Sequence, residues 1–190
     1  MSLSPPTSPR VLKHTRTITV EAYTRDDGLW DLDAHITDIK TRDVQLKAGM
    51  RFAGEPWHDL WLRITIDNRM QIVAAQAVSD RVPYPGFCQA VTPDYQRMVG
   101  LSLVQGFRFQ LMQRLGGVSG CTHLTELAQI LPTAAIQAFA SELTTLSKQD
   151  DENGTRPFQI DRCYSMRADG PAVAQYYPRW AVLPTGPGPR

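Results

Sequence analysis

The chain has 190 residues, 42% of them hydrophobic, and its 20 basic and 19 acidic side chains give a formal net charge of +1. This near balance argues against a nucleic-acid partner and against an anionic membrane surface. No apolar run approaches the roughly 20 residues that a membrane span needs, and the N-terminal MSLSPPTSPR lacks the apolar core of a secretory signal. We therefore expect a cytoplasmic protein.

Both ends of the chain are rich in proline, serine and glycine. Residues 1–13 and 184–190 are therefore expected to be disordered tails. The length and hydrophobic content of the remainder suit a single domain over residues 14–183.

Two β-hairpins are predicted in the first half of the domain. Residues 16–23 and 30–40 alternate apolar and polar side chains, and the turn signal RDDG separates them. Residues 60–67 and 70–78 form a second pair of apolar strands. The loop at 79–90 follows, where two prolines and a glycine oppose regular structure.

A helical segment is expected to begin at Thr92-Pro93-Asp94, which supplies an N-cap hydroxyl, a proline at the first helical position and a carboxylate. Apolar residues follow at helical spacing up to Gly116-Gly117, interrupted at Gly100 and Gly106. This stripe comprises Leu101, Val104, Phe107, Leu111 and Leu115.

A further helical stripe runs from Leu124 to Leu143, and Pro132 is expected to break or kink it. Strands in the first half and helices in the second indicate an α+β fold. We expect an antiparallel sheet of two hairpins packed against two or three helices.

The three cysteines are Cys88, Cys121 and Cys163, an odd number with no CxxC pair. In a reducing compartment they are expected to be free thiols or metal ligands rather than a disulfide framework. Inert thiols buried in the core are the alternative.

Cys121 and His123 lie where the glycine-rich loop becomes a helix. Unpaired backbone N–H groups at a helix N-terminus stabilise a thiolate, and an imidazole can bind a metal or act as a base. A buried thiol beside a surface histidine is the simpler interpretation of this pair.

A second candidate cluster lies at the ends of the second hairpin. His58 and Asp59 immediately precede the strand at Leu60, and Cys88 follows the return strand. Because a hairpin brings its beginning and end together, these side chains could meet Cys121 and His123. Such a mixed ligand set suits zinc or an iron–sulfur cluster.

Other chemistry remains open. Cys121 could be a nucleophile with His123 or His58 as its base. Arg16 and Arg25 could bind an anion or pair with nearby carboxylates. The chain has no GxGxxG after a strand, no GxxxxGK[ST], no GxSxG and no HExxH. A non-catalytic binding or interaction module with structural cysteines is the third alternative.

Several segments resemble the bacterial domain of unknown function 2889 family. They are HTR at 14–16, RDDGLWDLDAHITDIK at 25–40, LRITID at 62–67, GGVSGCTHLTEL at 116–127 and IDRC at 160–163. The resemblance spans nearly the whole chain between the tails, and it implies no established activity.

A second similarity is to iron–sulfur scaffold proteins of the IscU and NifU type. The resemblance implies three metal ligands. They are Asp59 in WHDLWLRITID, Cys88 after the hairpin, and Cys121 in GCTHLTEL. Trp57 stands where that family has its first cysteine, and Gly120 where a histidine often lies, so His58 and His123 would have to complete the site. The implied function is an accessory protein, rather than an enzyme, that holds a metal or cluster for a partner metalloenzyme or cluster-transfer protein.

Overall fold

The computed structural model describes residues 3–139, 152, 154–157 and 159–182. The chain groups into two compact units, Met1–Gln137 and Ala138–Arg190. The expected domain limits at residues 14 and 183 stay a prediction. The expected tail at 184–190 lies outside the described residues, and residues 3–13 contain no helix or strand.

A four-stranded antiparallel sheet forms the first unit, with the strand order β1-β2-β5-β6. The two hairpins predicted from alternation account for all four strands, so the α+β fold is confirmed. The strands are β1 (His14–Thr24), β2 (Trp30–Lys40), β5 (Pro56–Ile66) and β6 (Ile72–Arg81). A small hairpin, β3 (Val44–Leu46) with β4 (Gly49–Arg51), connects β2 to β5 in the chain.

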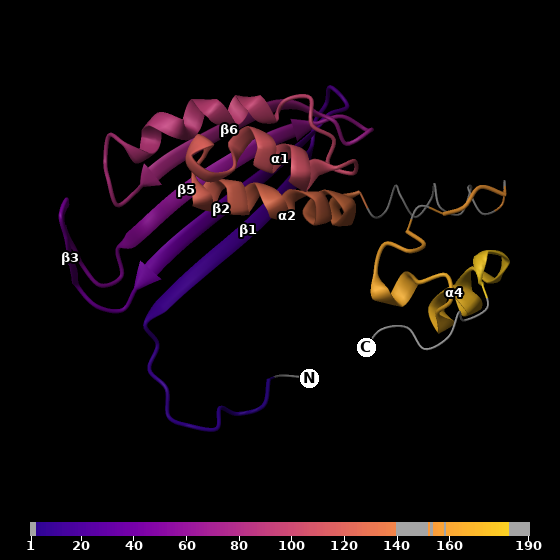
Figure 1. Ribbon diagram of the computed structural model, residues 1–190, viewed down its shortest axis with the longest axis horizontal. Coiled ribbons are helices and arrows are strands. Elements are labelled where there is room, and N and C mark those ends of the chain that lie inside the picture. The colour runs from indigo at the N-terminus through magenta and orange to yellow at the C-terminus, as the bar shows by residue number, and fades with distance from the viewer. Residues whose placement is uncertain (1–2, 140–151, 153, 158, 183–190) are drawn as a thin grey trace. The chain divides into compact units, whose positions relative to one another are not determined.

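Three helical segments lie over one face of this sheet (Figure 1). They are the 3₁₀ segment η1 (Cys88–Met98), the helix α1 (Phe107–Leu115) and the helix α2 (Thr122–Ala138). Every second residue of the central strands points toward these helices and is fully or almost fully buried. The buried strand residues are Leu32, Ala34, Ile36, Leu60, Leu62 and Ile64, and Leu111, Leu124, Leu127 and Leu131 come from the helices.

The helical segment expected from Thr92 to Leu115 is wrong at its start and in its middle. η1 already begins at Cys88, so Pro93 lies inside it rather than at its first position. Gly100 and Gly106 have φ values of 85° and 62°, in the left-handed region that ends a helix. Between them the chain runs beside β6, where the Ile72 N–H donates to the Leu101 carbonyl at 2.9 Å and the Leu103 N–H donates to the Met70 carbonyl at 2.9 Å.

The apolar stripe of that segment is therefore also partly wrong. Leu103 is buried and Val104 is 44% exposed, because the chain between Gly100 and Gly106 is not helical and does not follow helical spacing. The helical pattern returns in α1, where Phe107, Leu111 and Leu115 are buried as expected.

α2 continues through Pro132, so the expected break of the helix at this residue is wrong. Leu124, Leu127, Ala128, Leu131 and Ala135 form its buried stripe. Leu143, the last residue of the predicted stripe, lies outside the described residues.

The start of α2 is fixed by close contacts with the turn before it. A Cβ on Gly120 would lie 2.2 Å from the Leu115 carbonyl oxygen, so glycine is the residue that this approach accepts. Tyr95 is fully buried and accepts a hydrogen bond from the Cys121 N–H at 3.0 Å, while its hydroxyl contacts Thr125 Oγ1 at 2.8 Å. Thr125 in turn donates to the Leu115 carbonyl at 3.0 Å.

The second unit has its own small core of Ile160, Ala168 and Val173. Among its described residues are the elements η3 (Tyr164–Met166), α4 (Pro171–Tyr176) and η4 (Pro178–Trp180). Across the residues that the structure describes, none of the helices combines the length and apolar character of a membrane span.

We expect Tyr95→Phe to lower the free energy of unfolding by about 1–3 kcal/mol, because it leaves buried polar groups at the start of α2 without their partner. The same substitution at Tyr84, which is 55% exposed, should change it by less than about 0.5 kcal/mol. Urea denaturation of both variants measures the difference. Equal stability of the two variants would contradict the role of Tyr95 as the anchor of α2.

Candidate metal centre

A row of polar side chains crosses the helix-covered face of the sheet at the end of β2. In the strand register Arg16 lies opposite Asp38, and Asp38 lies opposite His58. Asp38 follows Leu32, Ala34 and Ile36 at period two, so it faces the same side as the core and is only 4% exposed.

Asp38 is hydrogen-bonded through both carboxylate oxygens. Arg16 donates to it in a two-pronged contact, with Nε 2.8 Å from Oδ1 and Nη2 2.9 Å from Oδ2. His14 Nε2 lies 2.8 Å from Oδ1, and His58 Nδ1 lies 2.9 Å from Oδ2. Because an ionised carboxylate can only accept, both imidazole nitrogens carry the proton in these contacts.

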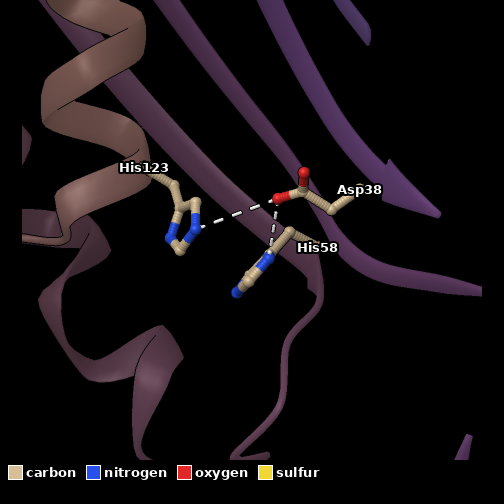
Figure 2. A group of neighbouring side chains, drawn as sticks. All are labelled: Asp38, His58 and His123. Atoms are coloured by element: carbon tan, nitrogen blue, oxygen red, sulfur yellow. Dashed lines mark hydrogen bonds and ion pairs between the residues drawn. The ribbon is translucent and has the colours of Figure 1, made fainter. Parts of the chain in front are cut away.

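His123 reaches the same carboxylate from the first turn of α2, as Figure 2 shows. Its Nε2 lies 3.8 Å from Asp38 Oδ2. The rings of His123 and His58 have their centroids 3.8 Å apart and are tilted by 31°. One ligand atom from each of Asp38, His58 and His123 lies within 4.8 Å of the other two. We call these three residues the Asp38 cluster.

The electrostatic environment keeps Asp38 ionised. Burial raises the pKa of a carboxyl group, but hydrogen bonds from Arg16, His14 and His58, together with the Arg16 charge, outweigh this effect. The pKa of Asp38 therefore lies well below its usual range.

The two histidines of the cluster are biased toward the neutral form. Burial lowers the pKa of His58, and the neighbouring His123 lowers it further, against the opposing effect of Asp38. Burial and then the Arg16 charge lower the pKa of His123. Neutral imidazoles keep a lone pair available at neutral pH, which is the state that binds a metal ion.

Asp59, a predicted ligand, lies apart from the cluster. Consecutive strand residues point to opposite faces, so Asp59 faces away from the helices when its neighbour His58 faces them. Its Oδ1 lies 2.6 Å from His35 Nε2, and the His35 ring stacks on Trp61 with a centroid distance of 3.8 Å.

The cysteines are placed differently from one another. Cys121 is half-buried, and its Sγ lies 4.0 Å from His123 Nδ1, the ring nitrogen remote from Asp38. Cys88 begins η1, and within the described part of the chain no hydrogen bond joins its thiol to the Asp38 cluster. Cys163 is exposed in the second unit. Of the five predicted ligands, the structure brings His58 and His123 together beside Asp38, and Cys121 contacts His123 on the side remote from Asp38.

Asp38 and His14 were missed by the sequence analysis, although one signal pointed to Asp38. Asp38 lies two positions after Ile36, on the apolar face of β2, and a carboxylate on that face is expected to be buried and paired. The expected pairing of Arg16 and Arg25 with nearby carboxylates is confirmed: Arg25 Nη2 lies 2.6 Å from Asp27 Oδ2. The Arg16 pair, however, is on the helix-covered face rather than on a solvated one.

These pKa shifts predict that stability falls as the pH falls. Below about pH 6.5 the unfolded chain protonates its histidines, whereas the folded protein resists protonation of His58 and His123 until lower pH. Below about pH 4 the unfolded chain also protonates its carboxyl groups while Asp38 stays ionised, which destabilises the fold further.

A double variant, His58→Asn with His123→Gln, tests the upper window. Each amide replaces one ring nitrogen without titrating, so the loss of melting temperature between pH 7.5 and 5.5 should be smaller than in the wild type. An unchanged slope in the double variant would show that these two histidines do not cause the effect.

Comparison with known proteins identifies a family. A family model described as "Protein of unknown function (DUF2889)" matches residues 14–137, a range that includes the whole Asp38 cluster and all four strands of the large sheet. Neither the curated proteins nor the solved structures contain a match to the chain, so the resemblance to iron–sulfur scaffold proteins stays a prediction. The chain belongs to the DUF2889 family of proteins of unknown function.

Proposed function

We propose that this protein binds a divalent transition-metal ion through Asp38, His58 and His123. The observation that carries the proposal is the convergence of three ligand atoms from β2, β5 and α2 within 4.8 Å. Two imidazoles and one carboxylate are a ligand set that suits zinc, and also iron(II) in a mononuclear site.

The distances between the ligand atoms support this assignment. A tetrahedral zinc ion with bonds of about 2.0–2.1 Å holds its ligand atoms about 3.3 Å apart. Asp38 Oδ2 lies 2.9 Å from His58 Nδ1 and 3.8 Å from His123 Nε2. Both separations from Asp38 lie within about 0.5 Å of the tetrahedral value. The ligand atoms of His58 and His123 lie within 4.8 Å of each other, so side-chain rotations that close this separation would bring the three atoms onto one ion.

The contacts of Asp38 with His14 and Arg16 would support a bound ion. His14 and Arg16 Nε occupy Oδ1 of Asp38, and Arg16 Nη2 approaches Oδ2. Such hydrogen bonds orient a ligating carboxylate. Binding requires one local change: His58 moves its proton from Nδ1 to Nε2, so the Nδ1 lone pair replaces the hydrogen bond to Asp38.

The donor set favours a mononuclear ion over an iron–sulfur cluster. Clusters are held mainly by cysteine thiolates, whereas the nearest thiol, Cys121, lies beside the ring nitrogen of His123 that faces away from Asp38. Delivery of the ion to a partner enzyme stays a prediction.

The Cys121–His123 contact favours a second candidate function, a thiol enzyme. A nucleophilic cysteine needs a base within hydrogen-bonding reach. Cys121 Sγ lies 4.0 Å from His123 Nδ1, which is longer than an ordinary contact of this kind. Both functions use His123, so they are distinguished by variants of the residues that the two sites do not share.

Titration of chelator-treated protein with Zn²⁺ tests the proposed function. The wild type should bind one equivalent, and Asp38→Asn, His58→Asn and His123→Gln should each weaken binding at least about 10-fold. At a free zinc concentration of about 100 times Kd, binding should stabilise the wild type by about 2.7 kcal/mol.

The opposite face of the sheet provides matched controls. His35→Gln and Asp59→Asn change a second histidine–aspartate pair, and they should leave zinc affinity unchanged. Cys121→Ala should retain one equivalent of zinc. If only Asp59→Asn or Cys121→Ala lost zinc, the proposed ligands would be wrong and the ligands predicted from sequence would be favoured. No zinc binding in the wild type, with Cys121 alkylated by iodoacetamide far faster than exposed Cys163, would favour the thiol enzyme.

A further inference from the structure

The Asp38 cluster supplies three ligands, one fewer than a tetrahedral ion takes. Among the residues that the structure describes, the convergent group contains Asp38, His58 and His123 and no fourth histidine, cysteine or acidic side chain. Figure 2 shows the ring nitrogen of His123 that faces Asp38 and the other ring nitrogen turned away from it. Cys121 contacts this second nitrogen, so it is placed to orient the His123 ring rather than to bind the same ion.

Solvent reaches the two imidazole ligands. The side chains of His58 and His123 are 16% and 25% exposed, whereas that of Asp38 is 5% exposed. Closed structural zinc sites surround the ion with four protein ligands, and catalytic sites keep one position for water or substrate. A group of three ligands, two of them partly exposed, corresponds to a site that keeps one position for water or substrate.

The charges around the cluster favour an anion at that position. Arg16 offsets the charge of Asp38, and an imidazole that binds a metal ion does so in its neutral form. A further charge near the cluster is that of Glu126, which pairs with Arg16 at 2.7 Å and is 46% exposed. A bound dication would therefore keep part of its positive charge and attract anionic ligands.

We infer that a metal ion held by Asp38, His58 and His123 keeps a solvent-facing coordination position that takes a small anionic ligand, such as a carboxylate-bearing molecule. This inference rests on the proposed metal site. It goes further by assigning an exchangeable ligand position and the chemical class that fills it.

Co²⁺ is the probe that tests the inference, because its visible absorption reports coordination number and ligand type. Protein loaded with one equivalent of Co²⁺ is titrated with azide, and the metal content is measured after the titration. Saturable change of the cobalt bands with the metal retained is the expected result. Unchanged bands at high azide, with Co²⁺ still bound, would overturn the open position while leaving the metal site intact. Failure to bind Co²⁺ and Zn²⁺ would instead overturn the proposed function.

Glu126→Gln provides an independent check on the charge argument. Removal of this negative charge should tighten azide binding on the order of two- to fivefold by Coulomb attraction. Glu21→Gln removes a carboxylate that bonds Tyr23 on the opposite side of β1, and it should leave azide binding unchanged. Equal effects of the two variants would contradict a local role for Glu126.

Discussion

Asp38 is nearly excluded from solvent beneath the helices, where an isolated carboxylate would cost several kcal/mol. The fold meets this constraint with donors from the two strands that flank β2: His14 and Arg16 from β1 and His58 from β5. Arg16 also pairs with Glu126, which ties β1 to α2. Burial of one carboxylate thus links sheet register, helix position and the chemistry of the cluster.

The burial of these two histidines has two consequences. It favours neutral imidazoles, so the fold loses stability when the solution becomes acidic, and the neutral imidazole is also the form that a metal ion requires. His58 and His123 lie ring against ring, so a proton on one disfavours a proton on the other. A bound dication would satisfy both lone pairs and Asp38 together, which supports the proposed metal site.

Much of the fold follows from local patterns in the sequence. Alternation identifies the four long strands because one face of each central strand is buried, and β5 places Leu60, Leu62 and Ile64 as that pattern requires. The segment from Gly100 to Gly106 was harder, since its apolar spacing suits a helix. Its conformation depends on hydrogen bonds to β6, a tertiary interaction that helical periodicity does not encode.

The site was predictable in part. His58 and His123 were identified as ligand types near strand and helix ends, but Asp59 was grouped with His58 although adjacent strand residues face opposite sides. Asp38 could have been recognised as a charge on the buried face of β2. Its partners could not, because His14, Arg16 and His58 meet it only through strand register, and register depends on the whole sheet.

X-ray absorption spectroscopy of the zinc-loaded protein tests the central claim most directly, because it reports the atoms bound to the ion. The account predicts a first shell of nitrogen and oxygen at about 2.0–2.1 Å, with the outer-shell scattering of two imidazoles. Sulfur at about 2.3 Å would contradict it and would place a cysteine, rather than Asp38, on the metal.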